Sequence, residues 1–198
     1  IAESKTKVHF NKFIGEELYD ALMIDTTIYD SKKVKADNED NTERSNKKEK
    51  ESKVNFECYS KLSGVSANNQ KDLQSKQTEF IQESRLNQKS TKPLMVIGHH
   101  PMYGFKDGSG LIVEGLIKLF KETIIPSCPN RDIYYLCADI HLYQESTFTF
   151  TLEGKPAKTI KQYIVGTGGT ELDKYYTGNP IQPTLPPGVT YENAKTNA

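Results

Sequence analysis

Apolar residues occur along this chain in short runs that polar segments separate. The run from Ala21 to Ile24 is brief and closes on polar residues 25–27, which favours a strand over a helix. The runs 93–98 (PLMVIG) and 133–138 (IYYLCA) are continuous and bounded by polar residues. This pattern is typical of buried strands, so the three runs predict the centre of a β-sheet.

Two other segments carry apolar residues at helical spacing. Between Asn69 and Leu86, apolar residues recur on one face of a polar background, which predicts an amphipathic helix. Between Gly110 and Ile125 the spacing predicts a second helix. We expect Pro126 to end that helix, because proline has no amide proton for the hydrogen-bond ladder.

The last third of the chain changes to alternation. Segments 146–152 and 159–165 alternate apolar and polar residues, as antiparallel strands with one wet face do. Beyond Asn179, prolines and polar residues predict a surface loop. Strands that alternate with helices and then continue as an antiparallel run predict an α/β fold, a mixed sheet with helical cover.

Charged residues dominate one internal segment. From Asp30 to Lys53 almost nothing apolar interrupts Lys, Glu, Asp, Asn and Ser. Such a segment buries too little surface to offset its ordering entropy, so we expect a solvated, mobile insertion at about residues 30–68. A docking site for a charged partner is the alternative interpretation. The 198 residues otherwise suit one domain, 1–198.

Charge and composition exclude some classes of function. The 26 basic and 26 acidic residues give no net charge, so we expect no nucleic-acid binding patch. No apolar run reaches the roughly 20 residues that a membrane span requires. The three dispersed cysteines match no zinc motif and suit reduced, structural thiols; a disulfide with one free thiol is the alternative in an oxidising compartment.

Ligand-type side chains follow two of the predicted buried strands. His99 and His100 come directly after the strand at 93–98, and Asp139 and His141 follow the strand at 133–138. Loops at the carboxyl ends of strands are where α/β folds assemble their sites. Imidazole and carboxylate groups are metal ligands, and residues two apart in an extended segment share a side. Each motif alone is also compatible with ordinary polar loop residues.

Together these motifs resemble the calcineurin-like metallophosphoesterase family, in its acid-phosphatase-like branch. The stretch VIGHHPMYGF resembles the family's Gly-His-x-Pro segment, and YYLCADIHLYQ resembles its Gly-His-x-His segment. LMIDTTIYD resembles the family strand that carries Asp-Thr. YIVGTGGTELD resembles the strand with a Gly-rich end in the acid-phosphatase-like branch. The resemblance covers about residues 18–30 and 70–173. It implies the carboxyl-terminal half of a four-layer α/β/β/α sandwich.

The resemblance also implies roles for particular residues. His99 and His141 would be metal ligands, Asp139 would replace a ligand histidine, His100 would be catalytic and Tyr103 would bind substrate. The cofactor would be two metal ions (Fe, Mn, Zn or Mg), and the substrate a phosphate ester. A carboxylate at Asp139 would favour harder ions and lower the positive charge available for phosphate.

Other parts of the family pattern are absent from the sequence. Apart from Asp139-Ile140-His141, which lies in the second motif, it contains no Asp-x-His; it also contains no Gly-Asp and no Gly-Asn-His-Glu/Asp segment, so three candidate ligands would have to serve two coordination shells. The chain begins at Ile1 rather than Met, and we expect the missing ligands to come from an upstream half on this or another chain. Localisation is not readable from the sequence. The alternative is a non-catalytic protein that keeps the fold for assembly or binding. Residues 166–169 are either a phosphate cradle or a tight turn, and His9 is expected to be structural.

Overall fold

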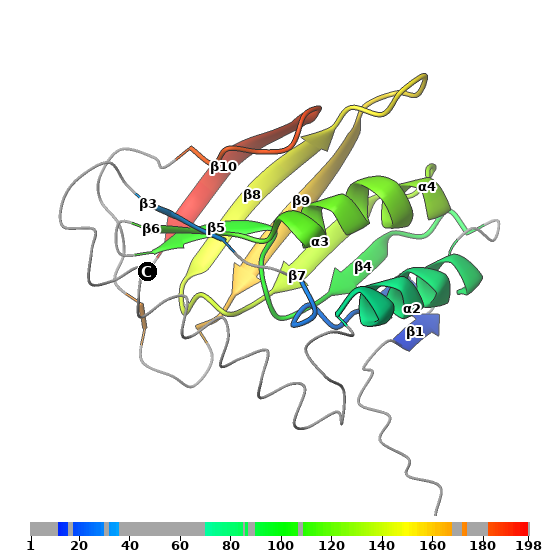
Figure 1. Ribbon diagram of the computed structural model, residues 1–198, viewed down its shortest axis with the longest axis horizontal. Coiled ribbons are helices and arrows are strands. Elements are labelled where there is room, and N and C mark those ends of the chain that lie inside the picture. Colours follow the sequence, from blue (N-terminus) through cyan, green and yellow to red (C-terminus); the bar gives the residue numbers. More distant parts are fainter. Residues whose placement is uncertain are drawn as a thin grey trace, which may run out of the picture.

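Among the residues that the structure describes, seven strands form the main sheet (Figure 1). The computed structural model describes residues 12–15, 18–29, 32–35, 70–84, 86, 90–106, 109–167, 172–173 and 182–197. In spatial order the strands are β1 (Lys12–Gly15), β2 (Asp20–Met23), β4 (Leu94–Ile97), β7 (Ile133–Cys137), β9 (Lys158–Val165), β8 (Tyr143–Phe150) and β10 (Val189–Asn197). The pairs β2–β4, β4–β7 and β7–β9 are parallel, whereas β1, β8 and β10 pair antiparallel. The fold is therefore mixed α/β, as predicted.

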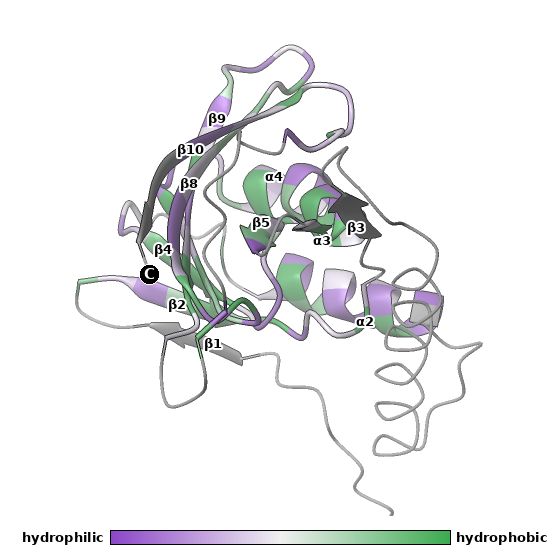
Figure 2. Cartoon of the chain, turned by 90° about the vertical axis from the view of Figure 1, so that its left-hand side faces the viewer, coloured by the Kyte–Doolittle hydropathy of each residue, from purple (hydrophilic) through white to green (hydrophobic). Residues whose placement is uncertain are grey.

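The helices that the structure describes lie on one side of this sheet. Figure 2 shows α2 (Gln70–Glu83) and the helical run of α3 (Glu114–Leu119) and α4 (Ile125–Ser127) on the same side of the curved strands. Beneath them, alternate strand residues such as Leu94, Val96 and Tyr135 are fully buried. The residues between them stay partly exposed, because none of the described helices covers the other face. The strand at 93–98 is therefore buried on one face only, and not on both as its continuous apolar run predicted.

The predicted second helix is wrong at both ends. Residues 109–112 form strand β6 (Ser109–Ile112), which pairs with β5 (Tyr103–Lys106) and β3 (Lys32–Lys35) in a small antiparallel sheet. Ile112 is buried as a strand residue, so its apolar side chain fitted either periodicity. The helix starts at Glu114 and passes Pro126 to end at Ser127. A π-helical turn, η3 (Phe120–Ile124), offsets the hydrogen-bond ladder before Pro126.

The predicted carboxyl-terminal loop is also wrong in part. Residues 189–197 form β10, which pairs with β8 along its length. The ring of Tyr191 contacts Tyr103 and Phe148, with ring centroids 4.9 and 5.3 Å apart. These aromatic contacts bury the ring of Tyr191 and so stabilise β10. The prolines that precede this strand led to the loop prediction.

The remaining predicted elements are confirmed where the structure describes them. The strand near residue 21, the helix at 69–86 and the antiparallel pair β8–β9 are present. The charged insertion contains β3, and its remainder, with His9, Cys58 and residues 168–171, lies outside the described residues. Cys128 and Cys137 are buried free thiols. None of the described helices is long and apolar enough to cross a bilayer.

A buried ion pair ties the amino ends of the parallel strands together. Nη2 of Arg131 lies 2.5 Å from Oδ2 of Asp20, and both side chains are almost fully buried. The same guanidinium donates to the carbonyl oxygens of Leu86, Lys92 and Pro93. Hydrogen bonds from every side satisfy this charge, as a buried ion pair requires.

Candidate metal and anion site

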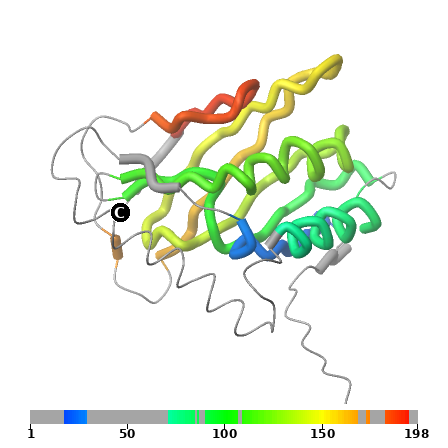
Figure 3. The backbone as a smooth tube through the Cα atoms, viewed as in Figure 1, coloured from blue at the N-terminus to red at the C-terminus, as the bar shows by residue number. Residues whose placement is uncertain are grey.

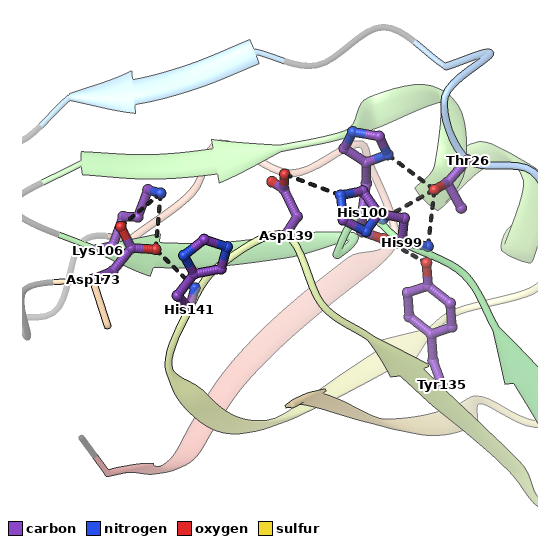
Figure 4. Close-up of polar contacts among 8 residues, drawn as sticks. All are labelled: Thr26, His99, His100, Lys106, Tyr135, Asp139, His141 and Asp173. Atoms are coloured by element: carbon purple, nitrogen blue, oxygen red, sulfur yellow. Dashed lines mark hydrogen bonds and ion pairs between the residues drawn. The ribbon is translucent and has the colours of Figure 1, made fainter. Parts of the chain in front are cut away.

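The carboxyl ends of three parallel strands converge on the candidate site (Figure 4). In register, Met23 of β2 pairs with Ile97 of β4, which pairs with Leu136 of β7. The chain leaving each strand therefore emerges at one edge. Figure 3 shows the segment after β2 beside the segment after β4, although about 70 residues separate them in sequence.

Three ligand-type side chains meet at this edge. One ligand atom each from His99, His100 and Asp139 lies within 4.8 Å of the other two. Nε2 of His99 is 3.5 Å from Oδ1 of Asp139, and their side chains are 59% and 31% exposed. The two imidazole rings meet edge to face with centroids 5.0 Å apart. The structure therefore brings together three of the four residues that the strand ends suggested.

The three groups differ in their proton affinities. The hydrogen bond with Asp139 raises the pKa of His99, against a smaller opposing effect of burial. Burial lowers the pKa of His100, although Asp139 opposes this shift. Burial alone would raise the pKa of Asp139, but the hydrogen bond from His99 and the neighbouring positive groups together lower it. The Asp139 carboxylate is therefore held ionised. Of its two neighbours, His99 has a raised pKa and His100 a lowered one.

Asp139 has an unusual backbone conformation. Its φ is +60°, and the amide of Ile140 donates to the carbonyl oxygen of Ala138 at 2.7 Å, which closes a three-residue turn. Left-handed conformations at a non-glycine residue persist where the surrounding structure imposes them, and they are concentrated at functional sites. The predicted extended geometry, with Asp139 and His141 on one side, is wrong because this turn separates their directions.

His141 lies apart from the three-residue cluster. Its backbone amide donates to Oδ2 of Asp173 at 2.7 Å, and the amide of Asp173 donates back to its carbonyl oxygen. Nζ of Lys106 binds both oxygens of the Asp173 carboxylate at 2.9 Å. Figure 4 shows this second group beside the first, with Lys106 nearest to Asp173. Within the described residues, the ligand-type cluster does not include His141.

Tyr103 is in the core rather than at the site surface. Its side chain is fully buried on β5, and its ring packs edge to face against Tyr191. Burial raises the pKa of its phenol well above the ordinary range. A ring with no exposed surface offers nothing to a substrate in this conformation, so its predicted role finds no support here.

Two glycines allow the close packing around the site. A Cβ on Gly98 would lie 2.6 Å from both Cγ2 of Thr26 and the hydroxyl of Tyr135. A Cβ on Gly166 would lie 1.9 Å from the carbonyl oxygen of Ile140. Gly166 therefore serves the close approach of the β9 end to the Asp139 turn, which accounts for that residue of the Gly-rich segment without a phosphate cradle.

The sequence interpretation missed Thr26, Tyr135, Lys106 and Asp173 as parts of this region. Oγ1 of Thr26 accepts hydrogen bonds from the amides of His99 and His100, and Tyr135 donates its hydroxyl proton to the carbonyl oxygen of His100. Thr26 had a usable signal, because it is one of the polar residues 25–27 that close a predicted strand. Lys106 and Asp173 had none, since their partnership depends on tertiary contacts.

The donor set of the cluster suits one metal ion better than two. His99 supplies an imidazole nitrogen and Asp139 an anionic oxygen, a combination that binds Zn, Mn or Fe. Within the described residues, this cluster contains three ligand-type side chains, whereas two metal ions would need roughly ten ligand positions. The cluster therefore fits part of a first coordination shell, and a second ion would require ligands from elsewhere.

Comparison with protein-family models found no match. Searches of curated proteins and of solved structures found none either.

Proposed function

We propose that this chain carries part of a metal-dependent site for phosphoester hydrolysis. The observation that carries the proposal is the convergence of His99, His100 and Asp139 at the carboxyl ends of adjacent parallel strands. This edge is where open α/β sheets build their sites, and both nitrogen and oxygen ligands are present there. The resemblance of the surrounding segments to calcineurin-like metallophosphoesterases supports the same conclusion.

The residues would have distinct tasks. His99 and Asp139 would hold a divalent or trivalent ion, which when bound supplies a lowered water pKa and charge neutralisation for the phosphoryl group. His100 lies on the same turn as His99 and is more buried, so its ring would meet the anionic part of a substrate. Thr26 binds an amide of that turn and Tyr135 binds its carbonyl oxygen, and these contacts would keep both rings near Asp139.

We also propose that the sheet forms half of a four-layer sandwich. The face opposite the helices carries a row of apolar side chains that are in register across the parallel strands: Met23 on β2, Ile97 on β4, Leu136 on β7 and Tyr163 on β9. Met95 and Tyr134 form a second pair beside this row. Parallel strands are ordinarily covered on both faces, so this open apolar face supports a second sheet as its partner.

The second half would complete the site as well as the fold. The apolar face and the His99–Asp139 cluster share the same strands, so a sheet packed on that face brings its own strand ends to the same edge. Those strand ends would supply the ligands that the described residues lack. The partner of this chain is therefore proposed to be the other half of the sandwich, on the same or a separate polypeptide.

The position of His141 favours a second candidate function. A predicted ligand that lies outside the cluster, beside the Lys106–Asp173 ion pair, suits a non-catalytic protein that keeps this fold for assembly or binding. In that case the His99–Asp139 pair would be an ordinary partly exposed ion pair.

Metal affinity separates the two candidates. The test uses the full-length protein and Mn²⁺, with the dissociation constant measured by calorimetry and turnover measured on p-nitrophenyl phosphate. Loss of even an outer-shell partner weakens metal binding by about 10–100-fold, so His99→Ala and Asp139→Ala should each weaken it by about 100-fold or more. Both variants should also lose turnover.

His141→Ala is the matched control. It removes a histidine from the same loop but outside the three-residue cluster, so metal affinity should stay within a few-fold of the wild type. If the intact protein binds no metal and has no turnover, the hydrolase proposal is wrong and the non-catalytic candidate remains. If His141→Ala behaves like His99→Ala, the site uses the loop in a different conformation.

A further inference from the structure

Thr26 lies at the centre of the turn that carries both histidines. Its side chain is buried and reaches this turn from the loop after β2 (Figure 4). Its Oγ1 lies 3.1 Å from the backbone nitrogen of His99 and 2.9 Å from that of His100. The same oxygen lies 2.9 Å from Nδ1 of the His100 ring.

The hydrogen-bonding capacity of a hydroxyl assigns the direction of the third contact. A threonine hydroxyl has one proton to donate and two lone pairs that accept. The two backbone amides can only donate, so they occupy both lone pairs of Oγ1. The hydroxyl proton is then left for Nδ1 of His100, which accepts it and must itself be unprotonated.

We propose that Thr26 holds neutral His100 in the tautomer protonated at Nε2, so that its ring presents an N–H donor to the space shared with His99 and Asp139. Thr26 acts here as a positioning residue. The assignment comes from counting donors and acceptors, which is how a tautomer is inferred when hydrogen atoms are not seen.

This tautomer gives His100 a different role from that of His99 and Asp139. A neutral imidazole binds a metal through an unprotonated nitrogen, and His100 has none free because Thr26 uses Nδ1 and Nε2 carries the proton. His100 is therefore a hydrogen-bond donor rather than a third metal ligand. The inference rests on the proposed function in one respect, since it makes an oxygen of a phosphate group the acceptor of the Nε2 proton.

The surrounding structure fixes the direction of this donor. Tyr135 donates its hydroxyl proton to the carbonyl oxygen of His100 at 2.5 Å, on the same turn whose amides Thr26 binds (Figure 4). Gly98 lets Thr26 and Tyr135 approach the chain this closely. With the backbone and Nδ1 both held, the ring has little freedom to rotate and present its other nitrogen.

Nuclear magnetic resonance reads the tautomer directly. Long-range ¹H–¹⁵N spectra of the ¹⁵N-labelled full chain, at a pH where His100 is neutral, separate protonated from unprotonated ring nitrogens. The signals of His100 are those that disappear in His100→Gln. We expect a downfield, unprotonated Nδ1 and a protonated Nε2. The opposite tautomer, or an equal mixture of the two, would overturn the proposal.

Two substitutions test the part of Thr26. Thr26→Ser keeps the hydroxyl and should leave the tautomer unchanged. Thr26→Val has a similar shape but no donor or acceptor, so the His100 signals should move toward a mixture of tautomers. An unchanged spectrum in folded Thr26→Val would overturn the proposal. If Thr26→Val does not fold, the wild-type and Thr26→Ser spectra still decide the tautomer.

Zinc and inorganic phosphate separate this inference from the proposed function. On addition of Zn²⁺, a ring nitrogen of His99 should shift, whereas His100 should keep its Nε2 proton. Inorganic phosphate should then shift that proton. Loss of the proton on zinc binding would make His100 a ligand and overturn the inference. If neither probe changes any histidine signal, the tautomer assignment stands and the proposed phosphoester site is wrong.

Discussion

The two ends of the same parallel strands differ in how completely their polar groups are satisfied. At the amino ends, the Arg131–Asp20 pair is almost fully buried, and three carbonyl oxygens and Ser90 complete its hydrogen bonds. At the carboxyl ends, His99 and Asp139 are partly exposed and 3.5 Å apart, and Asp139 itself has a left-handed backbone conformation. The contacts at the amino ends stabilise the fold. At the carboxyl ends, ligand-type side chains stay accessible, and one of them lies on a strained backbone.

The largest expected effect is at the amino ends. Arg131→Met should leave Asp20 as an uncompensated buried charge and lower the free energy of unfolding by about 3–5 kcal/mol. Urea unfolding measures this change as a lower midpoint at an unchanged slope. Lys118→Met is the control, because it breaks an exposed ion pair with Glu122 and should change stability by less than about 0.5 kcal/mol. A loss below about 1 kcal/mol in Arg131→Met would remove the contrast between the ends.

Burial should also make the thiol of Cys128, near the amino end of β7, slow to react. Burial raises the pKa of Cys128 to about 11, and Arg131 and Lys158 oppose this only in part. Because the raised pKa keeps the group protonated, thiolate appears only as the pH rises toward that value. In a Cys58→Ser background, where both remaining thiols are buried, the thiolate fraction of Cys128 at pH 8 should be about 100-fold below that of an ordinary thiol.

A thiol reagent such as Ellman's reagent gives the measurement. The folded protein should react slowly at pH 8, and the rate should rise as the pH approaches about 11. Addition of denaturant at pH 8 is the control, because both thiols should then react at once. Rapid reaction of one thiol in the folded protein at pH 8 would contradict the prediction.

The smallest expected effect is at the strained turn. Asp139→Gly removes a side chain from a residue with φ of +60°, a conformation that glycine adopts without steric penalty. It also removes a partly exposed ion pair, which is worth at most about 1 kcal/mol. The free energy of unfolding should therefore stay constant or rise by up to about 1 kcal/mol, while Mn²⁺ binding weakens. Asp139→Ala is the comparison, because it loses the same carboxylate but keeps the strain, and it should be less stable than Asp139→Gly. Equal stability would show that the turn is not strained.

The sequence located the candidate site better than it described its geometry. Two ligand-type motifs after two buried strands predicted that His99, His100 and Asp139 would lie together, and the structure places them so. The same argument placed His141 with them, which is wrong because it assumed an extended chain at Asp139. Backbone conformation at a single residue depends on the contacts around it, here including the close approach of Gly166. The proposed roles of these residues stay predictions.

The pattern of apolar residues by itself determined the central strands, the helix at 70–83 and the β8–β9 pair, because periodicity reports which face of a segment is buried. Tertiary structure alone decided that 109–112 pairs as a strand, that the carboxyl-terminal segment joins the sheet as β10, and that Tyr103 is buried against Tyr191. It also decided that Thr26 contacts His100. These outcomes depend on partners distant in the chain, and no local pattern in the sequence specifies which partner a strand or a hydroxyl will meet.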